Sequence, residues 1–421
     1  MTERPVNRVA IDTRPLRHPA YRRVFIGNSA SFFGTQVTAV AVPVQMYALT
    51  HSSLWVGYLG VAGLVPLLVF ALWGGALADA LDRRRLFLVA SSLSCLVTLA
   101  LLGQALLRVR SPGLLLGLVA VQSAAVAVAS STASAIVPRI VPLPEIPAAN
   151  TLSFTAATVA GVAGPLAAGA VIRYDIAWAY GIDAVTFSLA LWGALRLPPL
   201  LPGHVAGRSG AQSALVSHDR NRAGWADVLF GLRYIGTHKV LLLSFAIDIV
   251  AMVLAQPRAL FPAVAQLRFG GNGAIGALFA SIALGSAVAG LTSGWIGRIR
   301  RQGLALVCAV VVWGLAVAAA GLARQLWLAV ALLALGGAAD LVSAVYRQTI
   351  LQTYAPDELR GRMGGVFTAV VAGGPRLGDL RAGAMAVPLG ITTAWVGGGL
   401  ACVAVAVLLA AAFPALVRYR T

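Results

Sequence analysis

The chain has 421 residues, of which 59% are hydrophobic and 11% are charged. Soluble domains carry about a quarter of charged residues, so this composition excludes an ordinary soluble fold. A net charge of +18 would suggest nucleic acid in a soluble protein. Here the basic residues are spread over alternate joints between apolar runs, so we expect membrane topology to explain them, with no nucleic-acid partner.

Apolar runs long enough to cross a bilayer recur twelve times in chain order. A spanning helix needs about 20 mostly apolar residues. The runs cover 24–49, 54–77, 86–107, 113–137, 151–172, 177–196, 240–262, 274–296, 304–323, 326–347, 364–386 and 391–416. The pattern predicts an all-α membrane protein with twelve transmembrane helices.

The positions of the basic residues predict the orientation of these helices. With the first residues inside, 24 of the 32 Lys and Arg residues fall in cytoplasmic segments, including Arg347 at the end of the tenth run. Such residues are retained on the cytoplasmic side. We therefore expect a multi-pass protein with both termini in the cytoplasm, and a secondary attraction of its basic loops to anionic membrane lipid.

The chain divides into two halves at its longest polar stretch. We expect a cytoplasmic arm at 1–23, a six-helix bundle at 24–196, a cytoplasmic linker at 197–239, a second six-helix bundle at 240–416 and a tail at 417–421. The arm shows no cleaved signal peptide. Two pseudo-symmetric halves of this kind are typical of transporters that bind their substrate between repeats.

The joint at 74–88, GGALADALDRRRLFL, concentrates charge in an otherwise apolar region. It resembles the signature between the second and third helices of the major facilitator superfamily, through Gly75, Asp79, Arg83 and Arg84, although Ala80 and Asp82 depart from that pattern. The resemblance implies a conformational latch that closes the cytoplasmic side, with the aspartate facing the amino end of the eleventh helix. The alternative is a charge cluster that only sets topology.

A second resemblance lies in the fifth run, GVAGPLAAG. Its Gly161, Gly164, Pro165 and Gly169 resemble the Gly-Pro signature of superfamily exporters, in which small residues allow close helix approach. The alternative is an ordinary packing seam of small residues.

Longer segments resemble the family of bacterial siderophore (enterobactin) exporters, a branch of the major facilitator superfamily. They include AVPVQ at 41–45, IGALFASIALGSAVAGLTSG at 275–294 and ILQTYAPDELRGRMGGVFTA at 350–369. The resemblance implies the major facilitator fold and a monomer in the bacterial inner membrane. It also implies efflux of a small amphiphilic substrate, a siderophore or a drug as in multidrug resistance, by proton antiport. An importer of a small nutrient and a non-transporting receptor or scaffold remain the alternatives.

Acidic residues inside the runs are the candidates for proton coupling, because an ionisable group there is costly unless it serves a cavity or a partner. We rank Asp248 first, since it lies about 13 Å along its helix and near the bilayer midplane. Asp340 and Asp183 follow. For each of them a structural role in capping or helix packing is the alternative.

The candidates for substrate binding are led by Arg258, which is suited to an anionic group. Pro257 and Pro262 on either side of it are expected to disrupt the helix there. Snorkelling of Arg258 at the outer interface is the alternative. The remaining candidates are Gln36, Gln45, Phe33, Tyr47, Arg376 and Asp379, the last two of which form either part of a site or a self-neutralised cluster.

Neither an enzyme nor a metal site is indicated. No Gly-rich loop is followed by Lys, so ATP use is not expected, and Cys95, Cys308 and Cys402 lie inside runs without metal-ligand spacing. The sequence predicts no catalytic residue and no cofactor, with the energy supplied by a transmembrane proton gradient.

Overall fold

The computed structural model describes residues 12–80, 83–196, 233–271, 273–354 and 360–419. Within these ranges the side chains at 71–80, 83–84, 134–135, 137–139, 194 and 360–369 lie outside the description. All regular structure in the described ranges is helical. Residues 1–11 of the predicted arm and 197–232 of the predicted linker are not described, so the division into domains stays a prediction.

The first half of the chain forms six long helices. They are α1 (Pro19–Thr50), α2 (Ser53–Ala80), α3 (Arg83–Leu106), α4 (Pro112–Ile140), α5 (Ile146–Ile172) and α6 (Ile176–Leu195), with short 3₁₀ turns η1 (Arg14–Arg17) and η2 (Leu143–Glu145). The charge-rich joint at 74–88 is mostly helical, because α2 runs on to Ala80 and α3 begins at Arg83.

The second half forms another six crossings. They are α9 (Lys239–Leu254) continued by η3 (Arg258–Leu260) and α10 (Phe261–Arg268), then α11 (Gly273–Leu291), α12 (Gln302–Leu322), α13 (Leu326–Tyr354), α14 (Arg360–Leu389) and α15 (Ile391–Ala412), with η4 (Ser293–Arg298) and α16 (Pro414–Val417). Eleven described segments are long and apolar enough to cross a membrane. With α14, which carries Arg376, Asp379 and Arg381, the predicted twelve spans are confirmed.

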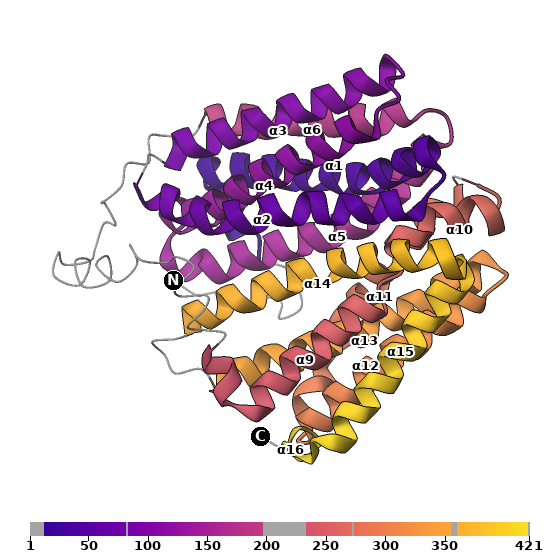
Figure 1. Ribbon diagram of the computed structural model, residues 1–421. Coiled ribbons are helices and arrows are strands. Elements are labelled where there is room, and N and C mark those ends of the chain that lie inside the picture. Colours follow the sequence, from indigo (N-terminus) through magenta and orange to yellow (C-terminus); the bar gives the residue numbers. More distant parts are fainter. Residues whose placement is uncertain (1–11, 81–82, 197–232, 272, 355–359, 420–421) are drawn as a thin grey trace.

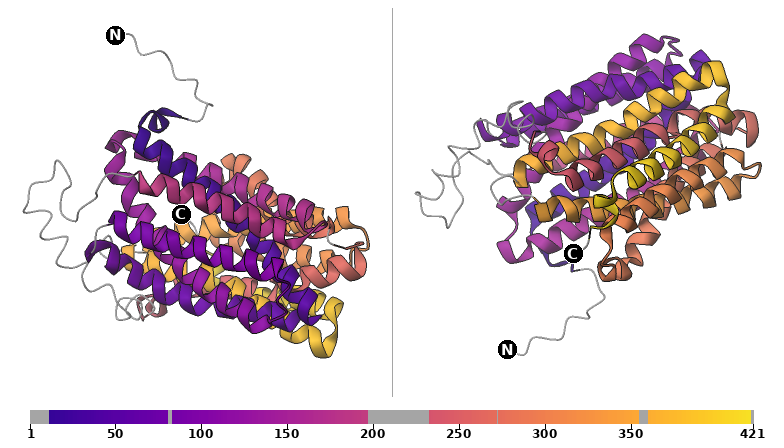
Figure 2. Two further views of the ribbon diagram at one scale, coloured as in Figure 1. Left: turned by 90° about the horizontal axis from the view of Figure 1, so that it is seen from above. Right: turned by 60° about the horizontal axis from the view of Figure 1, so that its bottom comes forward.

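The two halves lie side by side as separate groups of helices (Figure 1), α1–α6 in indigo to magenta and α9–α15 in red to yellow. Their long helices run in the same general direction in every view (Figure 2). We call the end where α1 begins and α6 ends the terminal end, and the end that holds the α1–α2, α5–α6 and α14–α15 connections the opposite end.

Proline, serine and glycine set the helix boundaries. Pro19 begins α1 and Pro112 begins α4, where the missing N–H costs nothing. Ser111 caps α4 by accepting a hydrogen bond from the Leu114 N–H at 3.2 Å. Gly390, at φ +79°, allows the sharp turn between α14 and α15.

Buried polar side chains tie helices together within the first half. The amides of Gln45 and Gln104 exchange two hydrogen bonds of 2.9 Å between α1 and α3, and the Tyr180 hydroxyl on α6 donates to Gln45 Oε1 at 2.5 Å. At the terminal end, the Tyr21 hydroxyl donates to the carbonyl of Ala149 on α5 at 2.9 Å. A bilayer offers no water to these groups, so they are satisfied internally.

Glycines bring the two halves into contact. A Cβ added at Gly276 on α11 would lie 2.5 Å from the Pro165 carbonyl oxygen, and one added at Gly169 on α5 would lie 2.8 Å from Gly276 Cα. A Cβ at Gly57 on α2 would lie 2.9 Å from Leu380 Cα on α14. These contacts lie towards the opposite end of the molecule, so small residues hold the halves together there.

The seventh span is interrupted beside Arg258, where the two prolines predict a disrupted helix. α9 ends at Leu254, and a 3₁₀ turn at Arg258–Leu260 precedes α10. Pro257 and Pro262 each lack an N–H, which explains why the α-helical ladder stops and restarts here.

Packing inside the second half depends equally on glycine, which gives a first prediction. A Cβ added at Gly337 on α13 would overlap the backbone carbonyl of Ile282 on α11. We expect Gly337→Val to destabilise the protein by about 1–3 kcal/mol through overpacking, measured by thermal unfolding in detergent. Gly117→Val on α4, where an added Cβ meets nothing within 4 Å, is the matched control. Equal stability of the two variants would contradict the prediction.

Candidate functional site

A cavity of about 470 Å³ lies between the two halves. Its walls come from α1, α2, α4 and α5 on one side and from η3, α11 and α14 on the other. The volume is within the range of small-molecule sites, and the residues come from both halves, as expected for a transporter that binds its substrate between them.

The two walls of the cavity differ in charge. The first half contributes uncharged polar groups, namely Thr35, Gln36, Thr38, Gln122 and Ser123. The second half contributes Arg258, Arg376 and Asp379. Around these groups lie apolar side chains such as Val56, Leu59 and Phe279, so the site suits an amphiphile that carries an anionic or hydrogen-bonding group.

The break in the seventh span positions Arg258. This side chain is exposed while its neighbours Pro257 and Ala259 are buried, and it lines the cavity. The Ala259 N–H donates to Asp379 Oδ1 at 3.0 Å. Asp379 on α14 therefore satisfies the irregular backbone that brings Arg258 into the cavity, consistent with broken helices being tolerated where they line a cavity.

Arg376 on α14 points towards the first half. Its guanidinium lies against Gly63 of α2, where an added Cβ would be 3.0 Å from Nη1. Among the described residues, this buried Nη1 has no hydrogen-bond partner, and neither has the buried Oε1 of Gln122. Unpaired buried polar atoms are unusual, and both residues line the cavity, where a bound molecule would supply the missing partners.

The Gly-Pro segment of α5 lies at the junction of three helices. Gly164 packs on α1, where an added Cβ would be 3.2 Å from the Phe33 carbonyl oxygen. Gly161 and Pro165 line the cavity, while Gly169 contacts Gly276 of α11. Three of the four predicted residues therefore lie at the cavity or at the contact between the halves, while Gly164 packs inside the first half.

Three of the predicted substrate residues are not among those that line the cavity. Gln45 is buried in its network with Gln104 and Tyr180, so its amide is engaged inside the first half. Tyr47 is 7% exposed and belongs to the core, and Phe33 packs against that core. The predicted Gln36, Arg258, Arg376 and Asp379 do line the cavity.

Asp183 lies in the interior of the first half rather than at a helix cap. It is fully buried on α6, and it accepts hydrogen bonds from the hydroxyls of Thr38 at 2.7 Å and Thr98 at 3.4 Å. Since Thr38 also lines the cavity, one hydroxyl separates this carboxyl group from the binding space.

Asp248 and Asp340 are brought together by an arginine that the sequence analysis assigned to a cytoplasmic segment. Arg347 lies inside α13, 5% exposed, and forms an ion pair through Nη1 with Asp248 Oδ1 on α9. Its Nη2 lies 3.8 Å from Asp340 Oδ1 on the same helix. Arg347 is thus a functional candidate that sequence reasoning missed. It stands at the end of the predicted run 326–347, whereas the helix continues to Tyr354 and so places Arg347 inside it.

The predicted latch cannot be described at the level of side chains. Gly75 and Asp79 fall in the last turns of α2, and Arg83 and Arg84 begin α3. Their side chains lie outside the described residues, so the latch stays a prediction.

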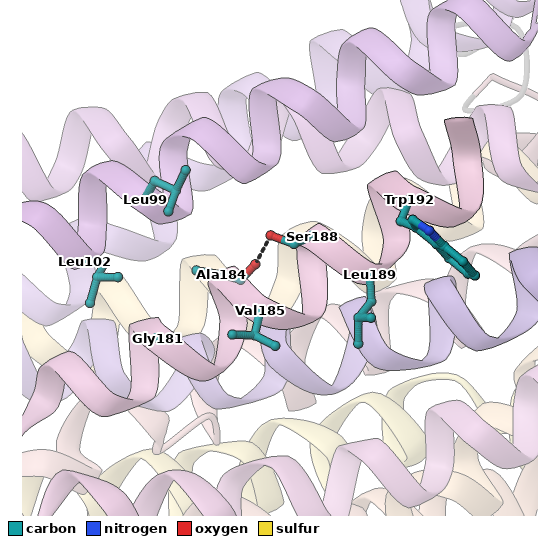
Figure 3. Close-up of a pocket in the computed structure, with 8 residues that line it drawn as sticks. All are labelled: Leu99, Leu102, Gly181, Ala184, Val185, Ser188, Leu189 and Trp192. Carbon is teal, nitrogen blue, oxygen red and sulfur yellow. Dashed lines mark hydrogen bonds between the residues drawn. The ribbon is translucent and has the colours of Figure 1, made fainter. Parts of the chain in front are cut away.

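A second hollow is lined by residues of α3 and α6 (Figure 3). Leu99, Val185 and Trp192 around it are 47%, 63% and 48% exposed. Ser188 lines it too, but its hydroxyl donates to the Ala184 carbonyl of its own helix at 2.8 Å. An exposed apolar groove of this kind is suited to contact with lipid. Within the described residues, no cluster of His, Cys, Asp and Glu is suited to a metal ion.

Comparison with known proteins supports the transporter architecture. Residues 11–418 match the MFS_3 family, described as transmembrane secretion effectors. The chain is 30% identical over 412 residues to enterobactin exporter EntS of Shigella boydii serotype 18, of Escherichia coli O139:H28 and of Citrobacter koseri. Each alignment covers 96% of this chain and 94% of the relative.

Solved transporter structures share the fold. The nucleoside transporter NupG superimposes with a TM-score of 0.71 at 15% identity, covering 95% of this chain and 100% of that one. A bacterial homologue of the lysosomal transporter Spinster, in an inward-facing and unoccupied conformation, gives 0.68 at 17% identity, covering 96% and 97%. The chain therefore belongs to the transmembrane secretion effector family of the major facilitator superfamily, and it is a multi-pass membrane transporter.

Proposed function

We propose that this protein is a secondary active exporter of a small amphiphilic molecule, a siderophore or a drug-like compound, across the bacterial inner membrane. Transport runs by alternating access and proton antiport, with both termini in the cytoplasm. The observation that carries the proposal is the cavity between the halves, with its uncharged polar wall and its wall of Arg258, Arg376 and Asp379. The relatives named enterobactin exporters support the substrate class and the direction.

Alternating access requires two arrangements of the halves, and the contacts support one of them. Gly169 with Gly276, and Gly57 with Leu380, bring the halves together towards the opposite end. In the proposed orientation that end faces outwards, so this arrangement is closed to the outside. The predicted latch of Gly75, Asp79, Arg83 and Arg84 would stabilise the reverse arrangement, which closes the cytoplasmic side.

Proton antiport needs a carboxyl group that takes up and releases a proton inside the membrane. Asp248, Asp340 and Asp183 are buried or partly buried acids at membrane depth. Substrate and proton need only favour different states of the carrier for exchange to result. The energy then comes from the proton gradient, without a bound cofactor.

An importer of a small nutrient is the second candidate, because the same fold occurs in solved nucleoside and peptide transporters. Inverted membrane vesicles separate the two functions. We expect vesicles that contain this protein to accumulate enterobactin, or the fluorescent amphiphile ethidium, when the interior is acidified. Vesicles without the protein and vesicles treated with a protonophore are the controls. Uptake into intact cells, without accumulation in inverted vesicles, would favour the importer, and no movement in either system would contradict transport of both probes.

The charged wall leads to a prediction about substrate choice. We expect Arg258→Ala to weaken the apparent affinity for anionic substrates by about tenfold or more, because a hydrogen bond to a charged group contributes about 1.5–3 kcal/mol. Neutral substrates should be little affected. Competition for transport by paired anionic and neutral probes measures the difference.

Two variants control for charge and for general damage in that experiment. Arg258→Lys keeps the positive charge and should retain part of the preference for anions. Arg173→Ala removes an exposed arginine that donates to the Tyr174 hydroxyl outside the cavity, and it should leave the preference unchanged. A uniform loss with both kinds of probe in Arg258→Ala would indicate a role in folding instead.

The glycine contacts lead to a prediction about conformation. A side chain at Gly276 would meet the Pro165 carbonyl and Gly169, so Gly276→Val should separate the halves at the opposite end. Spin labels at His51 and Thr393, one in each half at that end, should then report a longer distance in a Cys308→Ser background, which removes an exposed native thiol. Gly117→Val should leave the distance unchanged. An unaltered distance in Gly276→Val would show that this contact does not hold the halves together.

A further inference from the structure

Arg347 serves two acids in the second half but pairs closely with one of them. The ion pair joins Arg347 to Asp248. The Arg347 side chain is 5% exposed and the Asp248 side chain is 2% exposed. Asp340 Oδ1 lies 3.8 Å from the other guanidinium nitrogen, and the Asp340 side chain is 30% exposed. One guanidinium neutralises one carboxylate, so this three-residue cluster has one carboxylate in excess.

The side of α13 that carries Asp340 faces the interior of the protein. Leu335 and Val345 are 52% and 37% exposed, and they lie five residues before and after Asp340. At 3.6 residues a turn, each is about 140° around the helix from Asp340. The exposure of Asp340 is therefore on the face turned away from lipid.

Other charges near Asp340 come from the broken seventh span and from α14. Arg258 of η3 is close enough to interact electrostatically with Asp340, and it interacts in the same way with Asp379 on α14. Asp379 also interacts with Arg376 and Arg381. The neighbouring α11 carries no charged residue. Arg258 is thus shared between Asp340 and Asp379, and Arg347 is shared between Asp340 and Asp248.

We propose that Asp340 is the proton-binding residue of this carrier, and that Arg347 is the positioning residue that alternates between Asp248 and Asp340. While Arg347 is held by Asp248, a proton from water forms an O–H bond with a carboxylate oxygen of Asp340. When Arg347 moves to Asp340, that proton returns to water. This inference rests on the proton coupling in the proposed function, and it moves the coupling role from Asp248 to Asp340.

Electrostatic interactions explain why Arg347 pairs with one acid at a time. A carboxylate next to a guanidinium is stabilised in its ionised form by about tenfold or more, and an unpaired buried charge is costly. The arginine therefore favours close contact with one acid at a time, and while it is at Asp248 the more exposed Asp340 is left without a close partner. A pair with a purely structural role would not affect the proton occupancy of Asp340.

Chemical labelling of the full-length protein tests the proposal without a transport assay. A hydrophobic carbodiimide modifies protonated carboxyl groups in apolar surroundings, and peptide mass spectrometry over a pH series locates the modified residue. In the parent we expect modification at Asp340 and protection of Asp248. Asp248→Asn should release Arg347 to Asp340 and lower the labelling of Asp340 by roughly tenfold.

The double variant Asp248→Asn with Arg347→Gln distinguishes the switch from damage to the fold. It removes both charges of the pair, so it leaves no unpaired charge there, and the labelling of Asp340 should return to the parental level. Asp340→Asn should abolish labelling at that position. Asp175→Asn, which removes an acid from the α5–α6 connection, should leave the labelling of Asp340 unchanged.

Two results would overturn the proposal. One is labelling at Asp248 rather than Asp340 in the parent, and the other is unchanged labelling of Asp340 in Asp248→Asn. In inverted vesicles that transport ethidium or enterobactin, Asp340→Asn should abolish accumulation driven by the proton gradient. If the parent moves neither probe, the proposed function fails for those probes, while the labelling still decides where the proton binds.

Discussion

The cost of a charge inside a bilayer is the constraint on which the rest of this structure depends. A charged side chain at membrane depth must find a partner or a water-filled space. Asp248 finds Arg347 on a neighbouring helix, and Asp379 accepts a hydrogen bond from a freed backbone N–H at Ala259. Arg258 faces the cavity instead. These charges at membrane depth therefore mark either a tie between helices or a wall of the binding space.

Helix packing supplies the second constraint, since lipid gives little hydrophobic drive for helices to associate. Glycine allows backbones to touch both inside a half, at Gly337 against Ile282, and between halves, at Gly169 against Gly276. The two kinds of contact have different consequences. The first fixes the shape of a bundle, whereas the second must form and break if the halves are to move. The same residue type thus serves rigidity in one place and motion in the other.

Much of the fold followed from the sequence, because hydrophobic length is a strong signal for the twelve spans and proline is a strong signal for the break beside Arg258. The site was predicted less completely. Arg258, Arg376, Asp379 and Gln36 line the cavity, but Gln45 is engaged inside the first half by Gln104 and Tyr180. Arg347 was counted as a loop residue, because a single buried cation next to a polar segment has the same sequence signature as a topology signal. Which helix it meets depends on tertiary packing, and Asp248 is 99 positions away in the chain.

The two halves are chemically unequal, and this inequality bears on the mechanism. Around the cavity the first half presents amides and hydroxyls, while the second half presents Arg258, Arg376 and Asp379. When the halves separate, water reaches the charged wall, and when they close, that wall is partly dehydrated against neutral groups. Dehydration strengthens every interaction among the charges. Closure of the halves would therefore change how strongly Arg258 interacts with Asp340 and with Asp379. In the proposed antiport, a movement of the halves would in this way be coupled to proton occupancy in the second half, without any charged partner from the first.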